Sequence, residues 1–224
     1  MTVTGSMLGT GPDRIHVGSS GWSYPEWRGG FYPADAQPAD FLRHYAERLN
    51  AVELNATYYR LASEAQFESW AAQVPDGFRF AVKLTRAVVD GRLDRIGTFA
   101  ERISVLRARL GPVLVQLPEE RPRDEGMLRL LLDSLPLDLQ VAVEPQLPSW
   151  DDVELPVRVN SWDERQPFVY LRVRDGSDLE ALAERIRADP REVWCFLNRG
   201  EAADHSPDGV PTAEQAVRLS RLLR

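Results

Sequence analysis

The sequence has little of several residue types that carry chemistry or mark a cellular location. Its 224 residues include one cysteine, Cys195, three histidines, and one lysine, Lys83, beside 26 arginines. A single cysteine excludes a disulfide within the chain and is typical of a reducing compartment, so we expect a cytoplasmic protein. His16, His44 and His205 lack the spacing of metal ligands. We therefore predict no metal site built on histidine.

Long apolar runs and an excess of basic charge are also absent. No run approaches the roughly 18 apolar residues of a membrane-spanning helix, and the first residues do not have the pattern of a signal peptide. The formal net charge of -7 disfavours broad binding to nucleic-acid phosphates. The composition, 43% hydrophobic and 27% charged, is that of an ordinary globular protein. We expect a small-molecule ligand, no cofactor, no membrane or nucleic-acid partner, and an oligomeric state that the composition leaves open.

Short β-rich runs alternate with segments of helical period along most of the chain. The predicted strands are residues 15–20, 51–59, 78–84, 112–117, 139–144, 156–160, 168–173 and 192–198. Apolar residues at helical spacing, such as Phe67, Trp70, Ala71 and Val74, predict helices between most of them, including 40–49 and 96–110. This alternation predicts an α/β fold, a TIM-like (β/α)8 barrel, with a doubly wound open sheet as the alternative. We expect a flexible N-terminal tail at 1–13 and a single barrel domain at 14–224.

One part of the chain is too short for the regular pattern. Only residues 161–167 separate the predicted sixth and seventh strands. A parallel crossover normally needs a dozen residues or more, whereas seven extended residues span at most about 24 Å. We therefore expect the helices after strands five and six to be lost or vestigial.

Each predicted strand has one aliphatic face and one face that becomes polar near its carboxyl end, because side chains alternate along a strand. The polar residues of these second faces are Glu53, Asn55, Lys83, Gln116, Glu144, Arg172 and Asn198. Barrel enzymes build their active sites at the carboxyl ends of the strands. Because buried polar groups need partners, we expect these residues to meet at one mouth, hydrogen-bonded or facing a ligand.

Lys83, Glu53 and Glu144 are the candidate catalytic residues, acting by acid–base or Schiff-base chemistry on a small polar or anionic molecule. Structural ion pairing of Lys83 with either glutamate is the alternative role. A carboxylate-only Mg²⁺ or Mn²⁺ site at Glu53 and Glu144 is a further hypothesis. The candidate substrate-binding residues are Asn55, Gln116, Arg172, Asn198, Trp22, Tyr24 and Trp150.

Two loops and the single cysteine can each be interpreted as structural features or as functional ones. The backbone N–H groups of residues 18–21 (GSSG) could hold a phosphate, with Arg172 and Arg174 as anion donors, or the glycines could serve a turn. The aromatic loop that contains Trp22 and Tyr24 could cover the rim as structure or stack on a sugar or base. Cys195 falls on the aliphatic face, so we expect an inert core residue.

Several motifs resemble those of a known family. They are VGSSGWSYPEWRGGFYP, FLRHYAERLNAVELNATYYRL, FRFAVKL, GPVLVQLP and EPQLPSW. In these stretches the sequence resembles the domain-of-unknown-function 72 (YecE-like) family. The resemblance implies a TIM-like barrel with a lysine at the place of Lys83, and it implies no particular reaction.

The sequence also departs from the family pattern, which has histidines at three places. After strand five, where the family reads E-x-R-H-P-x-W, this chain reads EPQLPSW from Glu144 to Trp150. Residues 87–90 replace a Thr-His pair, and residues 172–176 (RVRDG) replace R-x-H-G. Two functions therefore stay open: an enzyme with altered chemistry, or a non-catalytic ligand-binding or regulatory protein that kept the pocket.

Overall fold

Parallel strands form the centre of the molecule. The computed structural model describes residues 14–120, 122–174, 176–198 and 212–224, so the tail predicted at 1–13 lies outside the described residues. The strands are β1 (Ile15–Ser19), β2 (Ala51–Leu54), β3 (Arg79–Lys83), β4 (Leu110–Leu117), β5 (Val141–Pro145), β6 (Phe168–Arg174) and β7 (Glu192–Asn198). They form two parallel sheets, β1-β7-β6 and β2-β3-β4-β5. The parallel α/β architecture is confirmed, but the strands form two sheets instead of one continuous barrel sheet.

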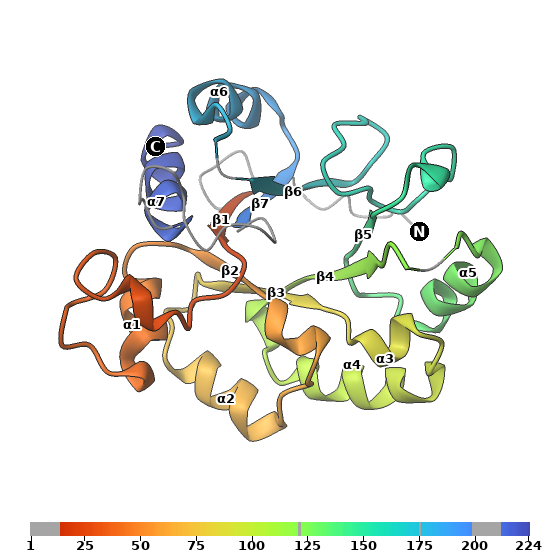
Figure 1. The fold of residues 1–224 in the computed structure, drawn as a ribbon, viewed down its shortest axis with the longest axis horizontal. Helices are drawn as coiled ribbons and strands as arrows, with labels where there is room; N and C mark the ends of the chain where they lie inside the picture. The colour runs from red at the N-terminus through yellow and green to blue at the C-terminus, as the bar shows by residue number, and fades with distance from the viewer. Residues whose placement is uncertain (1–13, 121, 175, 199–211) are drawn as a thin grey trace, which may run out of the picture.

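Helices lie outside the strands (Figure 1). They are α1 (Phe41–Ala46), α2 (Glu64–Ala72), α3 (Arg86–Val89), α4 (Ile96–Ser104), α5 (Glu125–Ser134), α6 (Leu179–Ala188) and α7 (Thr212–Leu222). The side chains of Ser63, Asp124 and Asp178 cap α2, α5 and α6 by accepting a backbone N–H three residues later. Among the described helices, none has the length and apolar character that a bilayer crossing requires.

The predicted sixth strand, 156–160, is wrong. This segment makes one isolated bridge to β5, in which the Val143 N–H donates to Val157 O at 2.7 Å and Val143 O accepts from the Val159 N–H at 3.0 Å. It also meets β6, because the Asn160 N–H donates to Tyr170 O at 2.9 Å. Asn160 has a left-handed backbone with φ of 61°, which ends the extended conformation after a few residues. The segment therefore links the two sheets at one point and does not extend either of them.

One further element boundary differs from the prediction, whereas the missing α-helix between β5 and β6 agrees with it. The strand predicted at 51–59 ends at Leu54, and the 3-10 helix η4 (Asn55–Tyr58) follows it directly. Between β5 and β6 every residue is described, and the only helical element there is the 3-10 helix η7 (Pro148–Trp150). The chain thus returns from β5 to β6 without an α-helix.

The two sheets also meet between β1 and β2, and side chains supply most of the bonds there. Gly18 approaches β2 so closely that an added Cβ would lie 1.9 Å from Ala51 O. The Tyr45 hydroxyl accepts from the Ser19 N–H at 2.7 Å and donates to Ala51 O at 3.1 Å. The Asn50 side chain accepts from the Val17 N–H and donates to Ile15 O, both at 2.8 Å. We call this contact the β1–β2 seam.

The buried side chains form two separate clusters, as the alternation along the strands predicts. The cluster between the sheets contains Ala51, Ala81, Leu114, Ala142, Val157, Val159, Phe168, Tyr170, Trp194 and Phe196. The larger cluster lies between the sheets and the helices and includes Cys195, which is completely buried. The predicted core position of Cys195 is confirmed, and burial raises the pKa of its thiol to about 12.

Candidate functional site

A buried carboxylate, Glu53, lies on the third residue of β2 and has no exposed surface. The Ser20 hydroxyl donates to its Oε1 at 2.6 Å, and the Tyr170 hydroxyl donates to its Oε2 at 2.8 Å. Arg172 Nη2 donates to Oε1 at 3.1 Å. The three donors all belong to the β1-β7-β6 sheet, so Glu53, on β2, joins its own sheet to β6 and to the end of β1. A charge this deep requires such a complete set of partners.

Arg172 extends this network to a second carboxylate. Its Nη1 donates to Glu144 Oε2 at 2.5 Å, and the Gln116 side chain donates to the same oxygen at 2.6 Å. Gln116 and Glu144 are direct neighbours in the β4–β5 register. The Glu144 side chain keeps 14% of its surface exposed, against 5% for Arg172. We call Ser20, Glu53, Gln116, Glu144, Tyr170 and Arg172 the charge cluster.

The electrostatics of the charge cluster follow from burial and from opposed charges. Burial lowers the pKa of Arg172, but the charges of Glu53 and Glu144 outweigh it and raise that pKa above its usual range. Burial raises the pKa of Tyr170 well above its usual value, and the neighbouring Glu53 charge raises it further. Arg172 is therefore a permanent cation and Tyr170 a permanent donor at any physiological pH.

Lys83 ends β3 at the same end of the sheets, and its side chain is nearly buried. Its ammonium group donates to Asn55 Oδ1 at 3.1 Å and lies 4.2 Å from the centre of the Tyr58 ring. The Thr57 hydroxyl lies within hydrogen-bond distance of both Leu54 O and Lys83 O, which ties η4 to the end of β3. A hydrogen bond to an amide oxygen and a cation–π contact both favour the charged form of an amine.

The remaining predicted binding residues lie around this end in different environments. Asn198 ends β7 beside Arg174 in register and is half-buried. The Tyr24 hydroxyl donates to Ser20 O at 2.6 Å, while Trp22 packs edge-on against Trp70 at 5.1 Å. Trp150 is buried in the cluster between sheets and helices. Of the three predicted aromatic residues, Tyr24 is the one that contacts a member of the charge cluster.

Of the two interpretations of residues 18–21, a phosphate loop or a structural turn, the backbone contacts favour the turn. The Ser19 N–H donates to the Tyr45 hydroxyl, and the Ser20 N–H donates to Leu197 O at 3.0 Å. The Gly21 N–H donates to Glu53 O at 2.9 Å. These amides are used inside the protein because the loop completes the β1–β2 seam, so they do not face an anion.

The predicted carboxylate pair does not form an open cation site. The Arg172 guanidinium binds both Glu53 and Glu144 and so occupies the place between their carboxylates. Within the described ranges, no group of three or more His, Cys, Asp or Glu side chains has a geometry that could hold a metal ion.

The sequence prediction did not include three residues that complete this region: Ser20, Tyr170 and Tyr58. Tyr170 lies two residues before Arg172 on the same face of β6, so strand alternation contained the signal. Ser20 follows the end of β1, and Tyr58 lies in the 3-10 helix η4 after β2, where strand alternation gives no information.

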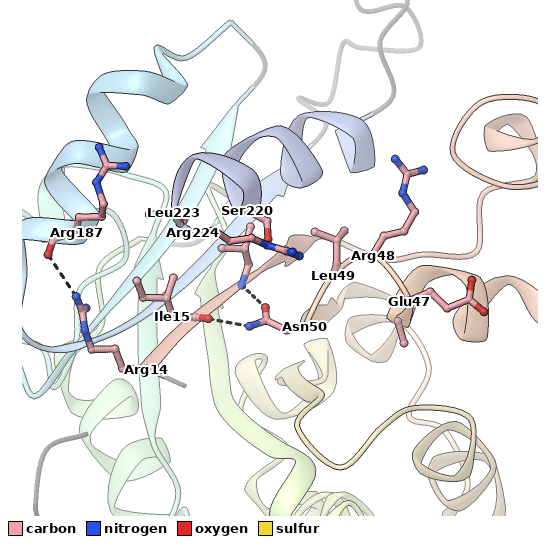
Figure 2. A pocket seen from close by; sticks show the side chains of 12 residues that line it. Arg14, Ile15, Glu47, Arg48, Leu49, Asn50, Arg187, Ser220, Leu223 and Arg224 are labelled. Carbon is pink, nitrogen blue, oxygen red and sulfur yellow. Dashed lines mark hydrogen bonds between the residues drawn. The ribbon is translucent and has the colours of Figure 1, made fainter. Parts of the chain in front are cut away.

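A pocket of about 550 Å³ lies at the opposite end, where β1 begins (Figure 2). Its polar groups serve the fold. The Arg14 guanidinium donates to Arg187 O at 3.3 Å and to Arg191 O at 3.0 Å, near the C-terminal end of α6. Asn50 binds the β1 backbone as described for the seam (Figure 2). We therefore assign this pocket a structural role, in contrast to the polar end of the sheets.

Comparison with known families decides the relationship of the chain. The family model for "Protein of unknown function DUF72" matches residues 16–162, which is more than half of the sequence. The chain belongs to the DUF72 family. The matched region contains Glu53, Lys83, Gln116 and Glu144, while Tyr170 and Arg172 lie beyond it.

Two solved DUF72 structures are similar to this DUF72 chain. The protein from Thermotoga maritima MSB8 is 21% identical with a TM-score of 0.71, covering 93% of this chain and 98% of that one. The protein from Enterococcus faecalis V583 is 16% identical with a TM-score of 0.69, covering 93% and 95%. At such identities the likeness shows the shared fold alone. No curated protein matches the sequence.

Proposed function

We propose that this DUF72 protein is an enzyme that binds a small, polar, anionic molecule over the carboxyl ends of β3, β4 and β5. In this proposal, Lys83 contacts the anionic group and Glu144 moves a proton to or from the bound molecule. Asn55, Gln116 and Arg172 hold these two side chains in place.

The environment of Glu144 carries the proposal. Arg172 and Gln116 both donate to Oε2 of Glu144, and no described residue donates to its Oε1. Glu144 is also the most exposed of the three ionised groups in the charge cluster. A carboxylate held through one oxygen, with its other oxygen open to a ligand, has the geometry of a general base. Glu53 is enclosed by three donors, so we assign it a positioning role that acts through Arg172.

For Lys83, the contacts support anion binding over Schiff-base formation. Its hydrogen bond to Asn55 and its position over the Tyr58 ring favour the ammonium form, whereas a Schiff base requires the free amine. Asn198, Tyr24 and Trp22 are proposed as outer contacts of the ligand, and the buried Trp150 as support for the chain after β5.

We also propose that the two sheets act together as a TIM-like barrel. Support comes from the bonds of residues 157–160 to β5 and β6, from the β1–β2 seam, and from the buried cluster shared between the sheets. In such barrels the carboxyl ends of the strands bind the substrate, which is where Lys83 and Glu144 lie.

The test is proton exchange between solvent and candidate ligands. Phosphorylated sugars and oxo acids are incubated with the protein in D₂O, and deuterium incorporation or consumption is followed by NMR. We expect one chemical class to react and Glu144→Gln to slow it by about 100-fold or more. Glu101→Gln, an exposed change of the same kind on α4, should leave the rate unchanged. An unchanged rate in Glu144→Gln would contradict the proposal.

A non-catalytic binding protein is the second candidate, favoured by the pairing of both carboxylates with one guanidinium. It predicts that no compound exchanges while some still raise the melting temperature. It also predicts that Lys83→Met and Glu144→Gln each raise thermal stability without abolishing those ligand-induced shifts.

A further inference from the structure

A pocket lined by four arginines lies beside the proposed site but outside the charge cluster. Its volume is about 520 Å³, and its lining includes Arg60, Arg86, Arg95, Arg102, Tyr58 and Tyr59. The walls come from η4 and the turn after it, from α3 and from α4 (Figure 1). Since η4 follows β2 and α3 follows β3, this arginine pocket opens at the carboxyl ends of those strands.

The charge of the arginine pocket is compensated only in part, by Asp90 beside Arg86 and by Asp94 near Arg95. Its lining residues include no aspartate or glutamate. Arg86 makes a long contact of 3.4 Å with Asp90, and Arg102 donates to Ala62 O at 3.3 Å. Among the residues that the structure describes, no carboxylate lies within ion-pair distance of Arg60 or Arg95. In a chain of net charge -7, four arginines around one cavity make a local positive field that an anion would neutralise.

An exposed aromatic ring adjoins these arginines. The Tyr59 side chain is 80% exposed, and its ring packs edge-on against the Tyr58 ring at 5.2 Å. The Tyr58 ring is buried and lies against Lys83, so it holds the neighbouring Tyr59 ring close to the end of β3. An aromatic face held in water offers a planar group a stacking surface.

We propose that the arginine pocket binds a phosphorylated small molecule that carries at least two phosphate groups and a planar ring. Guanidinium groups bind phosphate through paired N–H donors, and four of them balance more charge than a single phosphate carries. A volume of about 520 Å³ is within the ordinary range for small-molecule sites. The ring of the ligand stacks on Tyr59. This site is separate from the proposed proton transfer, since none of its arginines contacts Glu144, but it shares the Tyr58 ring with Lys83.

The test is calorimetric titration of the full chain with pyrophosphate and with ADP as probes, at low and at physiological salt. We expect one site for each probe, with affinity that falls as salt rises. Arg60→Gln combined with Arg95→Gln should weaken both probes by about 10-fold or more, because charge-assisted hydrogen bonds are lost. Arg129→Gln with Arg221→Gln changes the net charge equally at exposed positions on α5 and α7 and should weaken binding less than about two-fold.

A Tyr59 variant tests the contact with the ligand ring separately from the contacts with its phosphates. Tyr59→Ala should weaken ADP by about 2- to 10-fold and leave pyrophosphate unchanged. The proposed site is overturned if neither pyrophosphate nor ADP binds, or if the two arginine double variants lose equal affinity for the probes. An equal effect of Tyr59→Ala on both probes would overturn the ring contact. Because Glu144 is intact in every variant, a failure here leaves the proton-exchange test untouched.

Discussion

Arg172→Met is the perturbation whose effect the structure defines most closely. The guanidinium binds Glu53 Oε1 at 3.1 Å and Glu144 Oε2 at 2.5 Å, and its side chain is 5% exposed. Methionine fills a similar volume without charge. The variant would keep two carboxylates on the β2-β3-β4-β5 sheet and remove the one cation, supplied by the other sheet, that binds both of them.

The expected loss in the free energy of unfolding is about 3–5 kcal/mol, the usual effect of removing one partner from a buried ion pair. Glu53 dominates this figure because its carboxylate has no access to water and keeps only the neutral donors Ser20 and Tyr170.

Urea unfolding followed by circular dichroism measures this effect, and the midpoint should fall by roughly 1–2 M. Arg174→Met is the matched control, since Arg174 lies two residues later on the same face of β6 and is exposed; it should cost less than about 0.5 kcal/mol. Adding Glu53→Gln to Arg172→Met should restore part of the loss. The reasoning is refuted if Arg172→Met costs less than about 1 kcal/mol, or if the double variant is no more stable than the single one.

Two further predictions concern stability and reactivity. Gly18→Ala should destabilise the protein by about 2 kcal/mol or more, because its Cβ would lie 1.9 Å from Ala51 O, whereas Gly97→Ala, with open space on α4, should be neutral or slightly stabilising in the same unfolding assay. Cys195 should react with a thiol reagent at pH 8 only after unfolding, because burial both encloses the sulfur and raises its pKa to about 12; rapid labelling of the native protein would contradict this.

The sequence predicted the strands and the polar end of the sheets well where regular alternation applied. Gln116 and Glu144 contact each other because they are neighbours in the parallel β4–β5 register, and Arg172 reaches Glu144 from the corresponding end of the other sheet. Tyr170 lies on the same face of β6 as Arg172. An aromatic residue on an inner face is usually part of the core, so alternation alone does not mark Tyr170 as a site residue.

The prediction failed where backbone conformation stops being periodic. A strand continued through Asn55 in the prediction, but the chain turns into η4 there, and this turn brings Asn55 and Tyr58 to Lys83. Residues 156–160 have a β-rich composition, yet the left-handed Asn160 limits them to one bridge. Neither the direction of a turn nor the pairing of a short segment follows from side-chain period, because tertiary contacts decide both.

The β1–β2 seam has a consequence for how the polar end assembles. Two strands that pair through backbone hydrogen bonds tolerate almost any side chain. The β1–β2 seam instead depends on the side chains of Tyr45 and Asn50 and on the absence of a side chain at Gly18. Ser20 takes part in both structures, since its backbone bridges Glu53 at the seam and its hydroxyl binds the Glu53 carboxylate. Docking of the two sheets and assembly of the charge cluster thus depend on the same contacts, and neither sheet alone contains all the members of the cluster.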